Sequence, residues 1–408
     1  MSNLKIFTDN IEPEALNQIY TLVKQPAFSN AKVRIMPDVH AGKGCVIGFT
    51  ADLGEKVIPN IVGVDIGCGM LATKIEEPHI DFRKLDKIIR ESVPYGKGGV
   101  WAAPECTKEF PLIDRLFCKN ELKNVDYLRS SLGTLGGGNH FIEVDAISDG
   151  EKYLIIHTGS RNLGKQVAEI YQQKAVDSMD GLPKLKEACE TLIAEYKKAG
   201  RRKDIEKGLA ELKRKWQPEK RGIPKELCYL TGKDREDYLH DMEICQIFAE
   251  ENREQIRDVI FKNMEWRLPN SATFKGVSNF HTIHNYIDMD TNIVRKGAIS
   301  ARKGQVLLIP LNMRDGCILG VGKGNEDWNC SAPHGAGRLM SRSKAKEEIS
   351  LDEYKSSMQG IYTTSVTRAT IDESPMAYKP MEEILGHIGD TVEVLDVMKP
   401  LYNFKASD

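Results

Sequence analysis

Hydrophobic positions change their spacing twice along this chain. Up to about residue 160, short β-branched runs alternate with turns rich in glycine, aspartate and proline, as in residues 32–53 and 56–75. Residues 151–164 resemble a buried strand that ends in a polar loop. Similar runs return in residues 292–313, 316–325 and 391–404. This pattern predicts two strand-rich parts with tight turns.

The middle of the chain differs, because its apolar residues recur at helical spacing with charges between them. Residues 164–179, 182–200 and 235–264 carry this pattern, so we expect a helical insertion over residues 164–265. The two flanking strand-rich parts favour one catalytic body over residues 1–408. The expected fold class is α+β, with central, mostly antiparallel β-sheets flanked by helices.

Composition is that of a globular protein with a large core: 408 residues, 41% hydrophobic and 28% charged. The net charge of −2 excludes a bulk positive field, so a nucleic-acid site would need a local cluster of Lys and Arg. Residues 197–221 form such a basic stretch. It is either a solvated helix face or loop, or a contact for an RNA backbone.

Neither a signal peptide nor a membrane span is expected. The N-terminal residues carry early acidic side chains, and no apolar run approaches the length of a bilayer span. The nine cysteines are scattered without CxxC spacing, which predicts reduced thiols rather than a disulfide framework. These features predict a cytoplasmic protein.

Histidine is scarce, and most of the nine histidines stand beside glycines or polar loop residues at predicted strand ends. Asp65 and Cys68 are three residues apart on a glycine-flanked turn, so both can reach one point. A single Cys or His is ordinarily a packing or hydrogen-bonding residue, but the joint pattern predicts a metal site. Thiolate, imidazole and carboxylate ligands suit Zn, Mn, Fe or Co. His79, His240 and His387 lack this framing and are expected to be structural.

The segment HGAGR suits a different role. Gly335 and Gly337 leave backbone N–H groups free to approach an anion, and Arg338 adds a bidentate phosphate donor. His334 could attack phosphorus as a nucleophile or serve as a further metal ligand, and the residues alone leave both open. Residues 136–138 and 322–325 are glycine-rich but match neither common nucleotide-binding motif.

Taken together, these motifs resemble the RtcB family of RNA ligases. The likeness covers nearly the whole chain, through MPDVHAGKG, VGVDIGCG, GGGNHF, HTGSRNLG, HNY, RKGA, HGAGRLMSR and PMAYK. It implies two Mn²⁺ ions per active site, with Cys68 as the bridging ligand, and His334 as the residue that bonds covalently to GMP. The implied metal ligands are Asp65, Cys68, His140, His157 and His284.

The resemblance also implies a reaction and its partners. GTP would activate an RNA end with a 3′-phosphate or 2′,3′-cyclic phosphate, through a histidine–GMP intermediate and a GMP-capped 3′-end, for joining to a 5′-hydroxyl end. The setting would be RNA splicing, repair or tRNA processing, with an activator protein as a further partner. Arg161 and Arg338 would hold RNA phosphates, with ordinary salt bridges as the alternative. The implied nucleotide contacts are Asn139, Glu143, Gly335, Ala336, Tyr378 and Lys405.

One segment departs from the family pattern. Where the family often has P-G-S-M-G, this chain reads PLNMRDGC, so Asn312 and Cys317 replace hydroxyl residues. This departure is the best support for an alternative, a metallophosphoesterase that opens cyclic phosphates without His334. A non-enzymatic RNA-binding module would rest on the basic stretch, and a thiol enzyme lacks a second cysteine near Cys68. The complete ligand set argues against the binding module, because a binder needs no thiolate–imidazole cluster. The ligase is the preferred interpretation.

Overall fold

A seven-stranded sheet forms the centre of the computed structural model, which describes residues 3–96, 98–102, 109–216, 222–269 and 278–406. Every neighbouring pair in this sheet is antiparallel. The strands, in spatial order, are β11 (Val306–Asn312), β12 (Gly316–Gly322), β14 (Val392–Lys405), β5 (Phe141–Ala146), β6 (Lys152–Thr158), β4 (Gly69–Ile75) and β7 (Asn279–Ile283).

Two smaller sheets adjoin it. In the five-stranded sheet only the first pair, β1 with β2, is parallel. Its spatial order is β1 (Asn3–Ile6), β2 (Lys32–His40), β3 (Ile47–Asp52), β9 (Ile293–Lys296) and β8 (Asn285–Ile287). The third sheet pairs β10 (Ala298–Ser300) with β13 (Ser331–Pro333). The predicted α+β class with mostly antiparallel sheets is therefore confirmed.

Short helices lie between the strands of both strand-rich parts, where the sequence pattern predicted only strands and turns. In one of them the Asp81 carboxylate accepts hydrogen bonds from the backbone N–H groups of Arg83 and Lys84, and Leu85 and Ile89 are buried. Such a cap starts a helix whose apolar stripe covers the core. These helices are α1 (Pro13–Val23), α2 (Pro59–Val62), α3 (Phe82–Ser92), α4 (Val125–Arg129), α9 (Arg342–Glu348), α10 (Leu351–Ser357) and α11 (Met381–Ile388).

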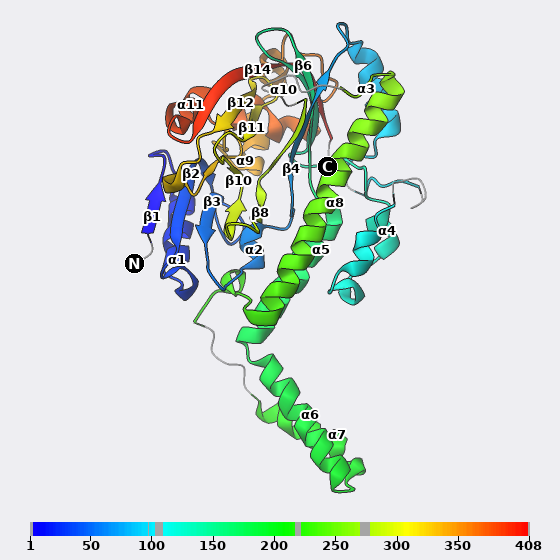
Figure 1. Ribbon diagram of the computed structural model, residues 1–408, viewed down its shortest axis with the longest axis vertical. Coiled ribbons are helices and arrows are strands. Elements are labelled where there is room, and N and C mark those ends of the chain that lie inside the picture. Colours follow the sequence, from blue (N-terminus) through cyan, green and yellow to red (C-terminus); the bar gives the residue numbers. More distant parts are fainter. Residues whose placement is uncertain (1–2, 97, 103–108, 217–221, 270–277, 407–408) are drawn as a thin grey trace.

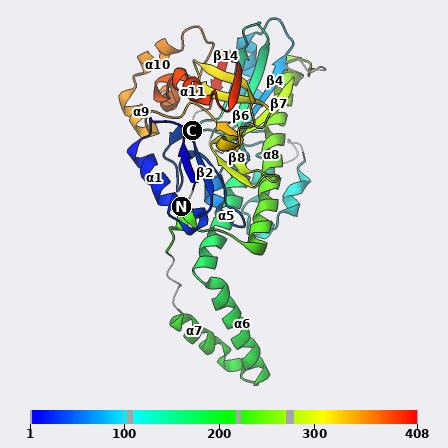
Figure 2. The same cartoon turned by 60° about the vertical axis from the view of Figure 1, so that its left-hand side comes forward.

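The middle of the chain is helical, as its spacing predicts. Two helices, α5 (Arg161–Met179) and α8 (Gly232–Met264), pack side by side on the body, and Ile256 and Ile260 of α8 join a core cluster with Ile156 of β6. Between them, α6 (Leu182–Lys198) and α7 (Ile205–Lys215) form a hairpin that projects from the body (Figures 1 and 2). Neither α6 nor α7 contains a buried residue.

The remaining helical turns are short 3₁₀ segments: η1 (Pro26–Phe28), η3 (Pro111–Arg115), η4 (Lys119–Glu121), η5 (Arg202–Asp204), η6 (Lys225–Leu227), η7 (Glu326–Trp328), η8 (Arg368–Glu373) and η9 (Pro375–Ala377). Among the described residues, no helix combines the length and the apolar character needed to cross a bilayer. The basic stretch falls partly on the hairpin, while its residues 217–221 lie outside the described part of the chain.

Candidate metal centre and adjoining cavity

The sheet brings five polar side chains together where several of its strands begin or end. Adjacent strands β5, β6, β4 and β7 are antiparallel, and their register places Phe141 opposite His157, and Gly69 opposite both Thr158 and Ile283. The start of β4 therefore meets the ends of β6 and β7 and the start of β5. The residues carried there are Asp65, Cys68, His140, His157 and His284.

These five side chains form two groups that share one sulfur. The ligand atoms of Asp65, Cys68 and His140 lie within 4.8 Å of one another, and so do those of Cys68, His157 and His284. Cys68 Sγ lies 3.5 Å from His140 Nε2 and 3.4 Å from His157 Nε2. A thiolate in this position can bridge two metal ions, and the donor set of sulfur, imidazole and carboxylate suits first-row transition metals.

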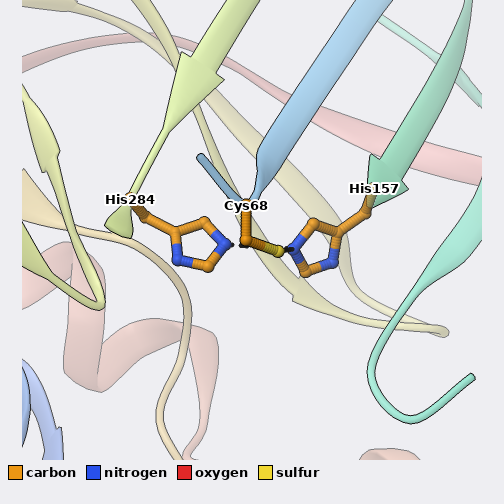
Figure 3. Close-up of side chains that lie close together, drawn as sticks. All are labelled: Cys68, His157 and His284. Atoms are coloured by element: carbon orange, nitrogen blue, oxygen red, sulfur yellow. Dashed lines mark hydrogen bonds between the residues drawn. The ribbon is translucent and has the colours of Figure 1, made fainter. Parts of the chain in front are cut away.

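The imidazoles are turned so that their Nε2 atoms converge. His157 Nε2 lies 3.1 Å from His284 Nε2, and Figure 3 shows these two rings pointing toward each other across Cys68. His140 Nδ1 lies 3.0 Å from the Leu135 carbonyl oxygen, and His157 Nδ1 lies 3.2 Å from that of Asn139. For His157, an Nδ1–H that donates to this carbonyl leaves the Nε2 lone pair free for a metal. His140 Nε2 lies 3.0 Å from Asp65 Oδ2, so these two candidate ligands contact each other directly.

Burial sets the charge states of the centre. It lowers the pKa of both His157 and His284 well below the usual value, so these imidazoles are neutral at pH 7. Burial also raises the pKa of the Cys68 thiol well above its usual value, with the charge of Asp65 adding to the rise. For Asp65, burial is outweighed by the hydrogen bond and charge of His140, and its pKa falls to about 2. His157, His284 and Asp65 are therefore in protonation states that bind metals, whereas the Cys68 thiol would lose its proton on binding one.

Two glycines allow the loops to close around these ligands. A Cβ atom at Gly159 would lie 2.2 Å from Asp65 Oδ1, so only glycine lets the loop after β6 pass this close. Gly136 has φ of +75°, and a Cβ atom there would lie 1.8 Å from Nη2 of Arg161. Arg161 in turn places Nη1 3.2 Å from Nδ1 of His140. The glycine-framed motifs therefore allow close approach of the loops at the candidate metal centre.

Helix α8 supports these loops with polar side chains on its buried face. Asn252 Oδ1 accepts hydrogen bonds from the N–H groups of Gly133 (2.6 Å) and Thr134 (2.9 Å). Arg253 Nη1 donates to the carbonyls of Gly67 (2.8 Å) and Thr158 (2.9 Å), beside the ligands Cys68 and His157. Neither residue lies in a glycine-framed motif, so neither was predicted, although two polar side chains on the buried face of a long helix are a readable signal.

His334 lies next to the metal centre but outside both ligand groups. Its ring centroid is 4.8 Å from that of His284. Its Nδ1 lies 2.6 Å from Asp38 Oδ2, and its backbone N–H donates to the same oxygen at 3.1 Å. Asp38 is fully buried at 0% exposure. A carboxylate that accepts from Nδ1–H fixes the tautomer and leaves a lone pair on Nε2, the state of a nucleophile.

In the sequence, Asp38 stands out only as part of MPDVHAGKG, and this motif alone predicts no role for it. Its contact with His334 joins residues 296 positions apart, which no local pattern reveals. His334 belongs to none of the groups of potential metal ligands that the described residues form, which favours the nucleophile over a further metal ligand.

A cavity of about 500 Å³ opens beside His334. Its volume suits a small molecule of nucleotide size. Arg338 and Asn312 also line it, together with all six residues that the family resemblance implies for nucleotide binding: Asn139, Glu143, Gly335, Ala336, Tyr378 and Lys405. Arg161 does not line this cavity and lies instead at the metal centre.

One buried carboxylate, Glu373, organises the basic wall of the cavity. It forms ion pairs with Lys405, Arg342 and Arg338 and accepts a 2.6 Å hydrogen bond from the Tyr378 hydroxyl. Burial tends to raise its pKa, but the charges of Lys405 and Arg342 prevail and lower that pKa to about 2. Lys405 is thus a buried member of β14 rather than a solvated terminal lysine. Glu373 carried no sequence signal and was missed.

Known proteins resemble the chain along nearly its whole length. The model of a family described as tRNA-splicing ligase RtcB matches residues 18–406. The RNA-splicing ligase RtcB of Escherichia coli strain K12 is 30% identical, with 95% of this chain and 93% of that protein covered. The tRNA-splicing ligase RtcB of Aeropyrum pernix is 26% identical, with 86% and 82% covered. An RNA-splicing ligase RtcB from Mycobacterium bovis is 25% identical, with 90% and 94% covered.

Proposed function

The chain belongs to the RtcB family of RNA-splicing ligases, and from this membership we propose that it joins RNA 3′-phosphate ends to 5′-hydroxyl ends with GTP and Mn²⁺. The observation that carries the proposal is the position of His334. Its imidazole is oriented by Asp38 and stands between the two-group metal centre and a cavity of nucleotide size. RNA ends are the substrates, and an activator protein is a proposed further partner.

The proposed reaction begins at His334. Its Nε2 attacks the α-phosphorus of GTP, a P–N bond forms and pyrophosphate leaves. An oxygen of the RNA 3′-phosphate then attacks the same phosphorus, which breaks the P–N bond and caps the RNA end with GMP. The 5′-hydroxyl of the second RNA attacks the 3′-phosphate, the phosphodiester forms and GMP departs. A 2′,3′-cyclic phosphate is first opened by water to a 3′-phosphate.

The residues around His334 have proposed roles in these steps. Two Mn²⁺ ions held by Asp65, Cys68, His140, His157 and His284 would polarise phosphate oxygens and offset the charge that develops there. Glu143, Tyr378 and Lys405 are the proposed guanine contacts, and Asn139 with the backbone of Gly335 and Ala336 contacts the GMP phosphate. Arg161 and Arg338 are the proposed contacts for RNA phosphates.

The proposal is tested by incubating the protein with Mn²⁺ and GTP radiolabelled at the α-phosphate, followed by denaturing electrophoresis. We expect a labelled band that acid removes, since a phosphoramidate is acid-labile. If the protein binds metal and hydrolyses cyclic phosphate but acquires no label, the ligase proposal is wrong and the phosphoesterase alternative takes its place.

Replacing Asp38 with asparagine is expected to slow the formation of the protein–GMP bond by about 10²–10⁴-fold. An amide can present its NH₂ group to Nδ1, which moves the ring proton to Nε2 and removes the attacking lone pair. Single-turnover labelling measures the rate, and equilibrium binding measures the GTP affinity, which we expect to change little. A normal labelling rate would exclude the orienting role of Asp38.

The projecting hairpin is a proposed contact for the RNA backbone, within the proposed helical insertion of residues 164–265. Around its tip, the exposed cations are Lys197, Lys198, Arg201, Arg202 and Lys203. The hairpin continues directly from α5, whose first residue, Arg161, touches the metal ligand His140. A 19-residue helix is about 28 Å long, so only an RNA that extends well beyond its reacting end can reach the tip.

Changing these five cations to glutamine is expected to weaken binding of long RNAs and to reduce its salt dependence, by up to about 0.7–0.9 in the logarithmic slope per lost phosphate contact. Ligation of short RNA ends should stay at the normal rate. The matched control changes Lys84 and Lys87 of α3, exposed lysines outside the hairpin. Equal salt slopes for both variants would refute the hairpin contact.

A further inference from the structure

Apart from the two groups at Cys68, a further group of potential metal ligands adjoins the nucleotide cavity through Glu143. Glu143 and Asp145 are two residues apart on β5, so they point to the same face of the sheet. Cys317 lies on β12, and β14 runs between these strands. The ligand atoms of the three residues lie within 4.8 Å of one another, and all three side chains are buried.

This group has more buried acceptors than donors. Asp145 is 0% exposed, and neither of its carboxylate oxygens accepts a hydrogen bond from an N–H or O–H group of the described residues; the Cys317 thiol is the polar group beside it. Asn403, also fully buried, donates its amide N–H to Glu143, but its own Oδ1 has no partner. A buried polar group without a partner costs about 1–3 kcal/mol, and a buried charge costs more. The group is therefore incomplete without a positive charge or added protons.

Within the described part of the chain, no cation beside Asp145 supplies that charge. Apolar members of one core cluster, among them Phe141, Leu319 and Met398, surround Cys317. The ammonium of Lys405 is near Glu143, but it pairs with Glu373 and donates to the Asn139 carbonyl at 3.4 Å. Asp145 thus faces the group with no cation of its own.

We propose that Glu143, Asp145 and Cys317 bind a divalent first-row transition-metal ion at a site separate from the Cys68 centre. Two carboxylate oxygens and one sulfur suit zinc or cobalt, with ligand distances of about 2.0–2.3 Å. Ligand atoms within 4.8 Å of one another fit around such an ion with small side-chain movements. The Cys317 thiol loses its proton to the solvent on binding.

The ion and a bound nucleotide share one residue. Glu143 belongs to this group and also lines the nucleotide cavity. If Glu143 contacts guanine, which rests on the proposed function, the ion competes with GTP for its carboxylate. Excess zinc then weakens GTP binding in the native chain more than in Cys317→Ala. The ion site itself does not depend on this consequence.

The test uses Co²⁺, because a cobalt–thiolate bond gives a charge-transfer absorption band. In full-length Cys68→Ala protein, which lacks the shared thiol of the other centre, we expect a thiolate band that saturates at one ion per chain. The band should disappear in Cys68→Ala/Cys317→Ala and persist in Cys68→Ala/Cys45→Ala, which removes another buried cysteine. Absence of the band in Cys68→Ala, or its survival without Cys317, would overturn the site.

A second variant guards against loss of folding. Asp145→Asn has nearly the same shape as the native residue and is expected to weaken Co²⁺ binding in the Cys68→Ala protein by at least about 10-fold. Circular dichroism checks the fold of every variant.

If Cys68→Ala does not fold, the Zn²⁺ content after dialysis is compared between native and Cys317→Ala protein. We expect one ion fewer per chain in Cys317→Ala. Equal Zn²⁺ content in native and Cys317→Ala protein, or unchanged Co²⁺ affinity in Asp145→Asn, would mean that Asp145 holds a proton instead of a metal ion. No GTP or RNA is present, so failure of the ligase proposal leaves these outcomes unaffected.

Discussion

Protein–GMP labelling is expected to disappear in His334→Ala, a loss of at least about 10⁴-fold, while the content of bound Mn²⁺ stays at the native level. The imidazole is the proposed nucleophile, and alanine has no atom that can attack phosphorus. His334 lies outside both ligand groups of the Cys68 centre, so its removal leaves every proposed ligand in place. Labelling with α-phosphate-labelled GTP and elemental analysis of the same samples measure the two quantities.

The matched control for this variant is His387→Ala. His387 lies in α11 and its Nδ1 hydrogen-bonds to the Glu383 carbonyl within the same helix, so labelling should be retained. An acid-labile GMP adduct on His334→Ala would assign the nucleophile to another residue. A simultaneous loss of Mn²⁺ would instead favour His334 as a metal ligand.

The Cys68→Ala variant is expected to lose both proposed Mn²⁺ sites together. Cys68 is the one residue common to the two ligand groups, so its removal takes a ligand from each ion at once. Loss of a supporting contact already weakens metal binding by about 10–100-fold, and loss of a shared ligand should exceed that. RNA ligation should fall below detection. Equilibrium dialysis with Mn²⁺ and a ligation assay test this.

Two control variants test whether the effect of Cys68→Ala comes from losing the shared ligand. Cys45→Ala removes a cysteine that is equally buried but belongs to neither ligand group, and it should ligate normally. Cys68→Ser keeps an oxygen ligand and should retain part of the Mn²⁺ binding, because manganese accepts oxygen donors. Full Mn²⁺ binding and full ligation in Cys68→Ala would contradict the bridging role.

The fold was predictable where a single spacing of apolar residues extended over a long segment. The long helical runs became α5, α6 and α8 with ends close to those expected, because apolar spacing over many residues has one interpretation. Helices α1 and α3 were not predicted among the strands of the first part. The signal for α3 was present in the Asp81 cap and in the helical spacing of Leu85 and Ile89, but it covers only 11 residues. A short element between strands is easily overlooked.

The site was predictable where its residues carry local marks. The glycines beside Cys68 and His157 are required by close approach, so the motif itself reveals a constrained loop. Asp38 and Glu373 have no such marks, because their roles come from contacts between distant parts of the chain. For Arg253 the sequence shows only a polar side chain on the buried face of a long helix, and not its contacts with Gly67 and Thr158. Burial of Lys405 could not be predicted either, since it follows from the pairing of β14 with β5.

The hairpin of α6 and α7 gives this chain a region that can evolve separately from the chemistry. With no buried residue in either helix, most substitutions there should change the free energy of unfolding by no more than about 0.5 kcal/mol. Natural selection can therefore alter the length and charge of the hairpin without endangering the fold. Such changes leave the candidate metal ligands in place, because none of them lies on α6 or α7.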